Sequence, residues 1–146
     1  MNDQELRGHI ETLSDRLTGL EQPLRTRYYL TCEAEQVYEI CRFLFEDVRA
    51  RFVIATVIDN DDNYEIVYHF AVDERGTVIN VQAFLRDRDH PTVASITPFL
   101  PGAEWIEREM HDLMGIHFEG HPRLERLILA DDWPDGVYPL RKGGAS

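Results

Sequence analysis

The sequence has little positive charge. Its 146 residues hold one lysine, Lys142, and Lys and Arg together number 15 against 27 Asp and Glu, for a formal net charge of -12. A nucleic-acid partner requires clustered Lys and Arg that displace counterions from phosphates. The scattered arginines of this chain lie among more numerous acids, so we expect no nucleic acid among its partners.

Cysteine is also scarce, and motifs that bind cofactors are missing. The two cysteines, Cys32 and Cys41, are spaced C-x8-C, whereas an iron–sulfur cluster usually takes four thiolates and a structural zinc takes four Cys or His in tighter pairs. No G-x-G-x-x-G, Walker A loop or G-x-S-x-G elbow occurs. We therefore expect two reduced core thiols, no cofactor in this chain, and redox chemistry only beside other subunits.

Long hydrophobic runs are missing as well. No window approaches the eighteen or so consecutive apolar residues that mark a membrane-spanning helix, and the acidic, amphipathic start "MNDQELRGHIETL" lacks the features of a signal peptide. These features predict a cytoplasmic protein with no direct membrane insertion.

The periodicities predict an α+β fold. Helices are expected at 3–18, 33–52 and 105–115, with a short one between 92 and 100; strands are expected at 25–32, 51–59, 63–73 and 77–86. Strands that follow one another favour a mainly antiparallel sheet of about four strands, with helices packed on one face as a second layer. We predict an α+β domain at 1–117 and an irregular C-terminal tail at 118–146.

The predicted helix at 105–115 is rich in charged residues. Ile106, Met110 and Leu113 form an apolar stripe, while three charged residues lie on another side: Glu104, Arg108 and Asp112. The simplest interpretation is a solvated face with weak ion pairs. A catalytic interpretation uses Glu107, Glu109 and Asp112, which cannot all point one way from a single helix. A metal site would use His111, His117 and His121, but their spacing is not that of helical H-E-x-x-H ligands.

The tail carries many apolar and aromatic side chains without a regular period. They include Phe118, Leu124, Trp133, Val137, Tyr138 and Leu140, interrupted by three prolines. Such residues must be covered, either by the chain's own sheet or by a partner. For residues 118–129 either the chain's own sheet or a partner could cover them, whereas for residues 133–142 we favour a partner surface.

The segment "WIEREMHDLMGIHFEGHPRLERLILADDWPDGVYPLRK" resembles a known family signature. It is similar to that of the small hydrophilic C subunit of NADH–quinone oxidoreductase, complex I, a family that includes the corresponding subunit of membrane-bound, energy-converting nickel–iron hydrogenases. The signature runs E-R-E-x-x-D, G-I-x-F-x-G-H-P, D-D-W and H-P-L-R-K. Two positions differ: Glu125 replaces a frequent basic residue, and Tyr138 replaces a frequent His. The few residues after Lys142 favour the hydrogenase type.

The resemblance implies a non-catalytic subunit on the cytoplasmic face of a membrane-bound complex. Its partners would be the large hydrogenase-like (D-type) subunit and cluster-binding subunits, which would hold the iron–sulfur clusters and the nickel–iron centre or quinone site. It implies no catalytic, cofactor or metal residue here. The expected partner-binding residues are Glu107, Arg108, Glu109, Asp112, Gly115, Phe118, Gly120, His121, Pro122, Arg126, Asp132, Trp133, Pro139, Leu140, Arg141 and Lys142.

Two further hypotheses remain open at this point. One is a small self-contained metal-dependent enzyme that uses Glu107, His111 and His121. The other is an adaptor that works outside any redox complex.

Overall fold

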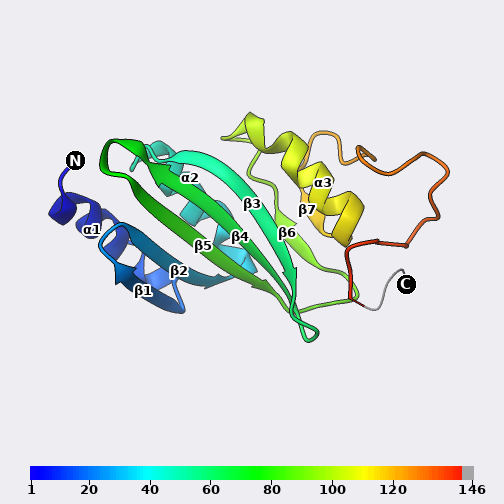
Figure 1. Cartoon of the computed structure of the whole chain (residues 1–146), viewed down its shortest axis with the longest axis horizontal. Helices are drawn as coiled ribbons and strands as arrows, with labels where there is room; N and C mark the ends of the chain where they lie inside the picture. Colours follow the sequence, from blue (N-terminus) through cyan, green and yellow to red (C-terminus); the bar gives the residue numbers. More distant parts are fainter. Residues whose placement is uncertain (143–146) are drawn as a thin grey trace.

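A five-stranded sheet forms one layer of the computed structural model, which describes residues 1–142 (Figure 1). Across the sheet the strands lie in the order β1 (Gly19–Leu24), β2 (Arg27–Glu33), β5 (Thr77–Leu85), β4 (Tyr64–Val72) and β3 (Arg51–Asp59). Strands β3, β4 and β5 form the predicted antiparallel meander. The alternating apolar residues of β4 place Ile66, Tyr68 and Phe70 in the core.

Helices form the second layer. In Figure 1, α2 (Val37–Glu46) lies behind the sheet, α1 (Asp3–Glu11) lies at the end of the sheet beside β1 and β2, and α3 (Glu104–Met114) lies beyond edge strand β3. Short 3-10 turns cover Ser14–Arg16, Ala34–Gln36, Asp73–Arg75 and Pro101–Ala103. This arrangement confirms the predicted α+β class, with a mainly antiparallel sheet and helices as a second layer.

Two strand pairings were not predicted from the sequence. Strand β2 runs parallel to β5, with Arg27 opposite Val78 and Glu33 opposite Phe84. Strand β1 lies at the sheet edge beside β2, in residues for which no strand was predicted. Pro23 within β1 is tolerated because an edge strand can leave one side without hydrogen bonds.

Three predicted helices were wrong in extent or in kind. The helix predicted at 3–18 ends at Glu11 and continues only as a 3-10 turn, and the one at 33–52 contains α2 at 37–46. The short helix expected between 92 and 100 is absent: strand β6 (Thr92–Ala94) lies there and pairs in parallel with β7 (His117–Glu119). The β-branched pair Thr92 and Val93 suits a strand better than a helix.

The hydrophobic core lies between the sheet and the helices. Cys32 and Cys41 are free, buried thiols in this core, as predicted. Burial is the main reason that the pKa of Cys32 rises to about 12, with smaller contributions from Glu33 and Glu35. Phe118, the first residue of the predicted tail, is buried within β7. The last four residues of that tail, 143–146, lie outside the described residues.

Candidate functional site

The residues of the signature gather where α3 meets the segment from 120 to 142. Figure 1 shows this segment, drawn in orange and red, looping away from β7 and returning past the end of α3. It contains no helix or strand. Its position therefore depends on a backbone hydrogen bond from the Leu140 N–H to the Leu113 oxygen at 3.0 Å and on side-chain contacts, which begin at α3.

Asp112 holds the middle of this segment. Its Oδ2 accepts hydrogen bonds from three successive backbone N–H groups, those of Leu127 at 2.7 Å, Ile128 at 2.8 Å and Leu129 at 3.1 Å. Burial on its own would raise the pKa of Asp112, but these three donors, with help from His111, lower it below the usual value. The carboxylate therefore accepts the backbone hydrogen bonds that a helix or sheet would otherwise accept in this stretch.

Arg108 holds the neighbouring residues through their carbonyl groups. Its Nε donates to the Glu125 oxygen at 3.1 Å and its Nη2 to the Arg126 oxygen at 2.9 Å. The guanidinium also lies over the Trp105 ring, 5.1 Å from its centroid, and the residue is only 6% exposed. Arg108 therefore binds the carbonyl oxygens, and Asp112 the N–H groups, of one continuous backbone stretch, residues 125–129.

Arg126 stabilises the outer loop. Its Nη1 donates to the carbonyl oxygens of Ala130 at 2.7 Å and Asp131 at 3.1 Å, and its Nη2 pairs with Asp135 at 2.8 Å. The indole of Trp133 donates to the Val137 oxygen at 2.8 Å. These local bonds give residues 126–137 a defined loop shape.

The end of α3 and the end of the described chain meet at Gly115. This residue adopts the left-handed conformation, φ 74°, that terminates the helix. A Cβ there would lie 2.6 Å from the Tyr138 ring and closer still to the Arg141 guanidinium. Arg141 donates to the Met114 oxygen at 2.8 Å and lies over the rings of Tyr138 and Tyr64. Glycine is therefore required at 115 both for its φ and for space.

Glu107 is buried on the opposite side of α3. Its Oε1 accepts a hydrogen bond from the Ser95 hydroxyl at 2.6 Å and its Oε2 one from the Ile96 backbone at 3.0 Å. Burial raises the pKa of Glu107 to about 7, although both hydrogen bonds act in the opposite direction. The carboxyl group therefore joins α3 to the segment after β6.

The three histidines do not converge on a metal site. His121 Nδ1 accepts the Arg123 N–H at 2.9 Å, which leaves Nε2 to donate to the Glu104 oxygen at 3.0 Å. His111 Nδ1 lies 2.8 Å from the Ile116 oxygen, and His117 is exposed on β7. Within residues 1–142 no three His, Cys, Asp or Glu side chains are placed to hold a metal ion.

The structure thus divides the sixteen expected partner-binding residues. Nine have internal roles that are described above or lie in the core: Glu107, Arg108, Asp112, Gly115, Phe118, His121, Arg126, Trp133 and Arg141. The solvated face suggested for Arg108 and Asp112 was wrong, since α3 turns both toward the segment that follows it. Of the other seven expected residues, Gly120, Pro122, Asp132, Leu140 and Lys142 are exposed, while Glu109 and Pro139 are partly buried. Partner contact by any of them stays a prediction.

Sequence reasoning missed the partners of these residues. Ser95 binds Glu107, and Asp59 of β3 accepts the Lys142 N–H at 2.9 Å while pairing with Arg88 at 2.7 Å. No local pattern marks either, because each contact joins segments far apart in the chain. Tyr138, which packs beside Gly115 and Arg141, could have been singled out by its position in the signature.

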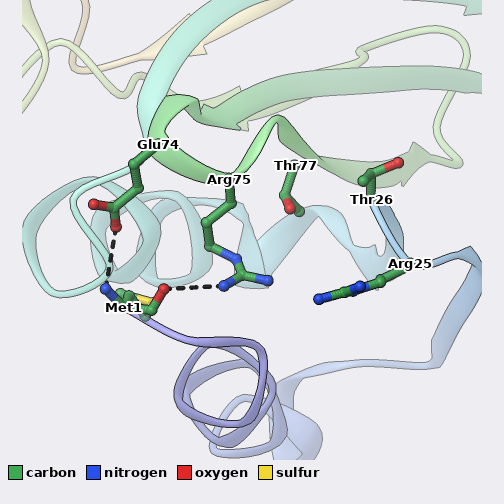
Figure 2. A pocket seen from close by; sticks show the side chains of 6 residues that line it. All are labelled: Met1, Arg25, Thr26, Glu74, Arg75 and Thr77. Carbon is green, nitrogen blue, oxygen red and sulfur yellow. Dashed lines mark hydrogen bonds and ion pairs between the residues drawn. The ribbon is translucent and has the colours of Figure 1, made fainter.

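A separate polar hollow lies at the other end of the sheet. Figure 2 shows it lined by Met1, Arg25, Thr26, Glu74, Arg75 and Thr77. Arg75 donates to the Met1 oxygen at 2.9 Å, and Asp3 pairs with both Arg25 and Arg75. These bonds join the start of α1 to the sheet, remote from the residues of the signature.

Comparisons with known proteins cover most of the chain. Residues 30–144 match the family described as respiratory-chain NADH dehydrogenase, 30 Kd subunit. The C subunit of the F(420)H(2) dehydrogenase of Methanosarcina mazei is 35% identical over 85% of this chain and 78% of its own length. The C subunit of the NADH-quinone oxidoreductase of Rhodopseudomonas palustris is 37% identical over 77% of this chain. Formate hydrogenlyase subunit 5 of Escherichia coli is 32% identical over 97% of it.

The chain spans only part of some relatives: 58% of the Rhodopseudomonas protein and 26% of the Escherichia protein. Among solved structures, an archaeal respiratory membrane complex, the membrane-bound sulfane sulfur reductase, contains a chain with a TM-score of 0.79 and 26% identity, covering 96% of this chain and 83% of that one. A fragment of Nqo5 shares the fold, with a TM-score of 0.67 and 19% identity over 84% of this chain and all of the fragment.

Proposed function

Since this chain belongs to the family of the respiratory-chain NADH dehydrogenase 30 Kd subunit, we propose that it is a non-catalytic subunit of a complex I-like membrane oxidoreductase. In this role it packs against the large subunit that holds the quinone site or nickel–iron centre, and so helps to assemble the peripheral arm. The relatives include both a quinone oxidoreductase subunit and a hydrogenlyase subunit. The large subunit that binds this chain decides between the two types.

The observation that carries the proposal is the preformed shape of residues 120–142. Arg108, Asp112 and Arg141 use their charged groups to hold the backbone of this segment against α3. The segment meanwhile exposes two large apolar side chains, with Ile128 57% and Leu140 61% exposed. A loop ordered before binding loses less conformational entropy when a partner covers it. Ordered backbone with exposed apolar residues is what an assembly surface requires.

The same proposal places redox groups in other subunits. The chain would bind neither cluster nor nickel–iron centre, and the cluster-binding subunits of the complex would carry electrons past it on the cytoplasmic face of the membrane. No helix in the described part of the chain has the length and apolar character needed to cross a bilayer.

Co-purification from the native host tests the proposal. A tagged chain, expressed in place of the native copy, should recover a large hydrogenase-like subunit and iron–sulfur subunits from detergent-solubilised membranes. The double variant Ile128→Asp, Leu140→Asp should lose them, because a charged group cannot be desolvated cheaply in an apolar contact. Leu24→Asp, at an equally exposed leucine on β1, is the matched control. Failure of the unchanged chain to recover these subunits would contradict the proposal.

A further inference from the structure

An apolar groove separates edge strand β3 from α3. Val53 and Ile54 of β3 form one wall, and Trp105 and Ile106 of α3 form the other, around a volume of about 560 Å³. Three of these side chains are large and open to solvent: Val53 is 47%, Ile54 44% and Trp105 59% exposed. Exposed apolar residues collected in one hollow are typical of a surface that another chain covers.

A β-bulge shapes the strand wall of this groove. Phe52 is opposite Phe70 and Ile54 is opposite His69, so Val53 is an extra residue without a partner on β4. An extra residue interrupts the alternation that would otherwise send neighbouring side chains to opposite faces. Val53 and Ile54 are consequently both exposed, and the interrupted edge favours binding through side chains over the addition of another strand.

The groove has one charge that nothing in the described chain balances. Its only charged lining residues are Arg51 and Glu109, and both Arg51 nitrogens Nε and Nη2 bind Asp73, at 2.8 and 2.9 Å. The Glu109 side chain makes no hydrogen bond or ion pair within residues 1–142, whereas Glu107, Arg108 and Asp112 of the same signature all do. The E-R-E-x-x-D motif therefore divides into three internal contacts and one free carboxylate.

We propose that this groove receives an apolar segment of a partner subunit that carries one Arg or Lys, and that Glu109 pairs with that cation. The inference rests on the proposed function and names the contact that would fix the partner's register. An acidic group beside partly dehydrated apolar walls attracts a cation more strongly than it could in open solvent, and it disfavours uncharged or acidic segments. The net charge of -12 also disfavours a second copy of this chain as occupant.

Cross-linking in the assembled complex identifies the occupant. A photoreactive amino acid at Val53, incorporated into the chain in its native host, should capture a partner peptide that has apolar residues around one Arg or Lys. Capture of a second copy of this chain, capture of lipid alone, or no capture within an intact complex would each overturn the proposal.

Charge variants test the role of Glu109. Glu109→Gln should reduce recovery of the partner subunit by at least about tenfold, the factor that corresponds to about 1.4 kcal/mol, without changing the melting temperature of the isolated chain. Glu104→Gln, the same change on the same helix but outside the groove, should leave recovery unchanged. Glu109→Arg should lose the partner, and replacing the captured cation with Glu should restore recovery.

The two proposals fail in different ways. If the unchanged chain recovers no large subunit, the proposed function fails. If it recovers the complex, but Glu109→Gln behaves as Glu104→Gln does or the charge exchange restores nothing, then the assembly role stands and the assignment of Glu109 is overturned.

Discussion

The Oδ2 atom of Asp112 lies 2.7 Å from the backbone nitrogen of Leu127, fifteen residues further along the chain. The bond joins the last half of α3 to a segment with no helix or strand of its own. The conformation of residues 127–129 therefore depends on the ionised carboxylate of a residue in α3.

Lowering the pH should release this loop. The pKa of Asp112 is lower in the folded chain than its ordinary value of about 3.9, so its stabilisation is fully present above that value and is lost as pH falls through the folded pKa. The protection factors of residues 127–129, which compare their amide exchange with that of an unstructured peptide at the same pH, should therefore fall in this acid range before those of the core amides do. Asp112→Asn should show fast exchange already at pH 7. Equal protection in parent and variant would contradict the assigned role.

Glu107 should give the opposite pH dependence. Its pKa rises from about 4.3 when unfolded to about 7 when folded, so the folded state binds more protons between these values. The free energy of unfolding should fall as pH rises from about 4 to 7, by at most about 1.4 kcal/mol per unit. Urea unfolding of Glu107→Gln should lose this slope. Glu104→Gln, whose side chain is not buried, should retain it.

Alanine at position 115 should displace the end of the chain. Gly115 and Gly120 both have positive φ, but only at Gly115 would a Cβ meet Tyr138 and Arg141. Both substitutions incur backbone strain of about 1–2 kcal/mol, and Gly115→Ala adds a steric clash. We expect a larger drop in melting temperature for Gly115→Ala, together with increased solvent exposure of Tyr138 by fluorescence quenching. Equal drops would mean that the clash is relieved at no cost.

Removing the Arg108 guanidinium should destabilise the free chain. Arg108→Ala loses two charge-assisted hydrogen bonds to carbonyl groups, which typically contribute about 1.5–3 kcal/mol each when they are buried. The control is Arg42→Ala, which breaks an exposed i,i+4 pair with Glu46 and should cost below about 0.5 kcal/mol. Denaturant unfolding measures both. A stability like the parent's for Arg108→Ala would indicate that Arg108 acts only toward a partner.

Both thiols should resist modification in the native state. Cys32 and Cys41 are buried, and burial raises the pKa of each, so little nucleophilic thiolate forms near neutral pH. A chromogenic aromatic disulfide, which releases a coloured thiolate on reaction, should react with neither cysteine until urea unfolds the chain, and then with both. Fast reaction of either thiol in buffer would show that the core opens locally.

The local sequence determined those elements whose evidence lies within a few residues. The alternation of Tyr64, Ile66, Tyr68 and Phe70 predicted strand β4, and the apolar spacing of Ile106 and Met110 predicted α3, because period two and period 3.6 are properties of neighbouring residues. The signature from Trp105 to Lys142, read as one string, indicated the family that the comparisons then established.

Only the tertiary structure decided the long-range pairings. The parallel neighbours β2 and β5 are separated by α2 and two strands, and β6 joins β7 across α3. A short segment such as Thr92–Ala94 has no strong period, so its conformation depends on the partner it finds.

The direction in which each motif residue points was decided by tertiary structure too. Helical spacing shows which residues share a face of α3, but not what each face meets. Asp112 points inward because the Leu127 backbone needs an acceptor there, whereas Glu109 lines the open groove beside β3. Adjacent charges in one short motif thus differ in role because packing decides whether each gains a partner or stays hydrated.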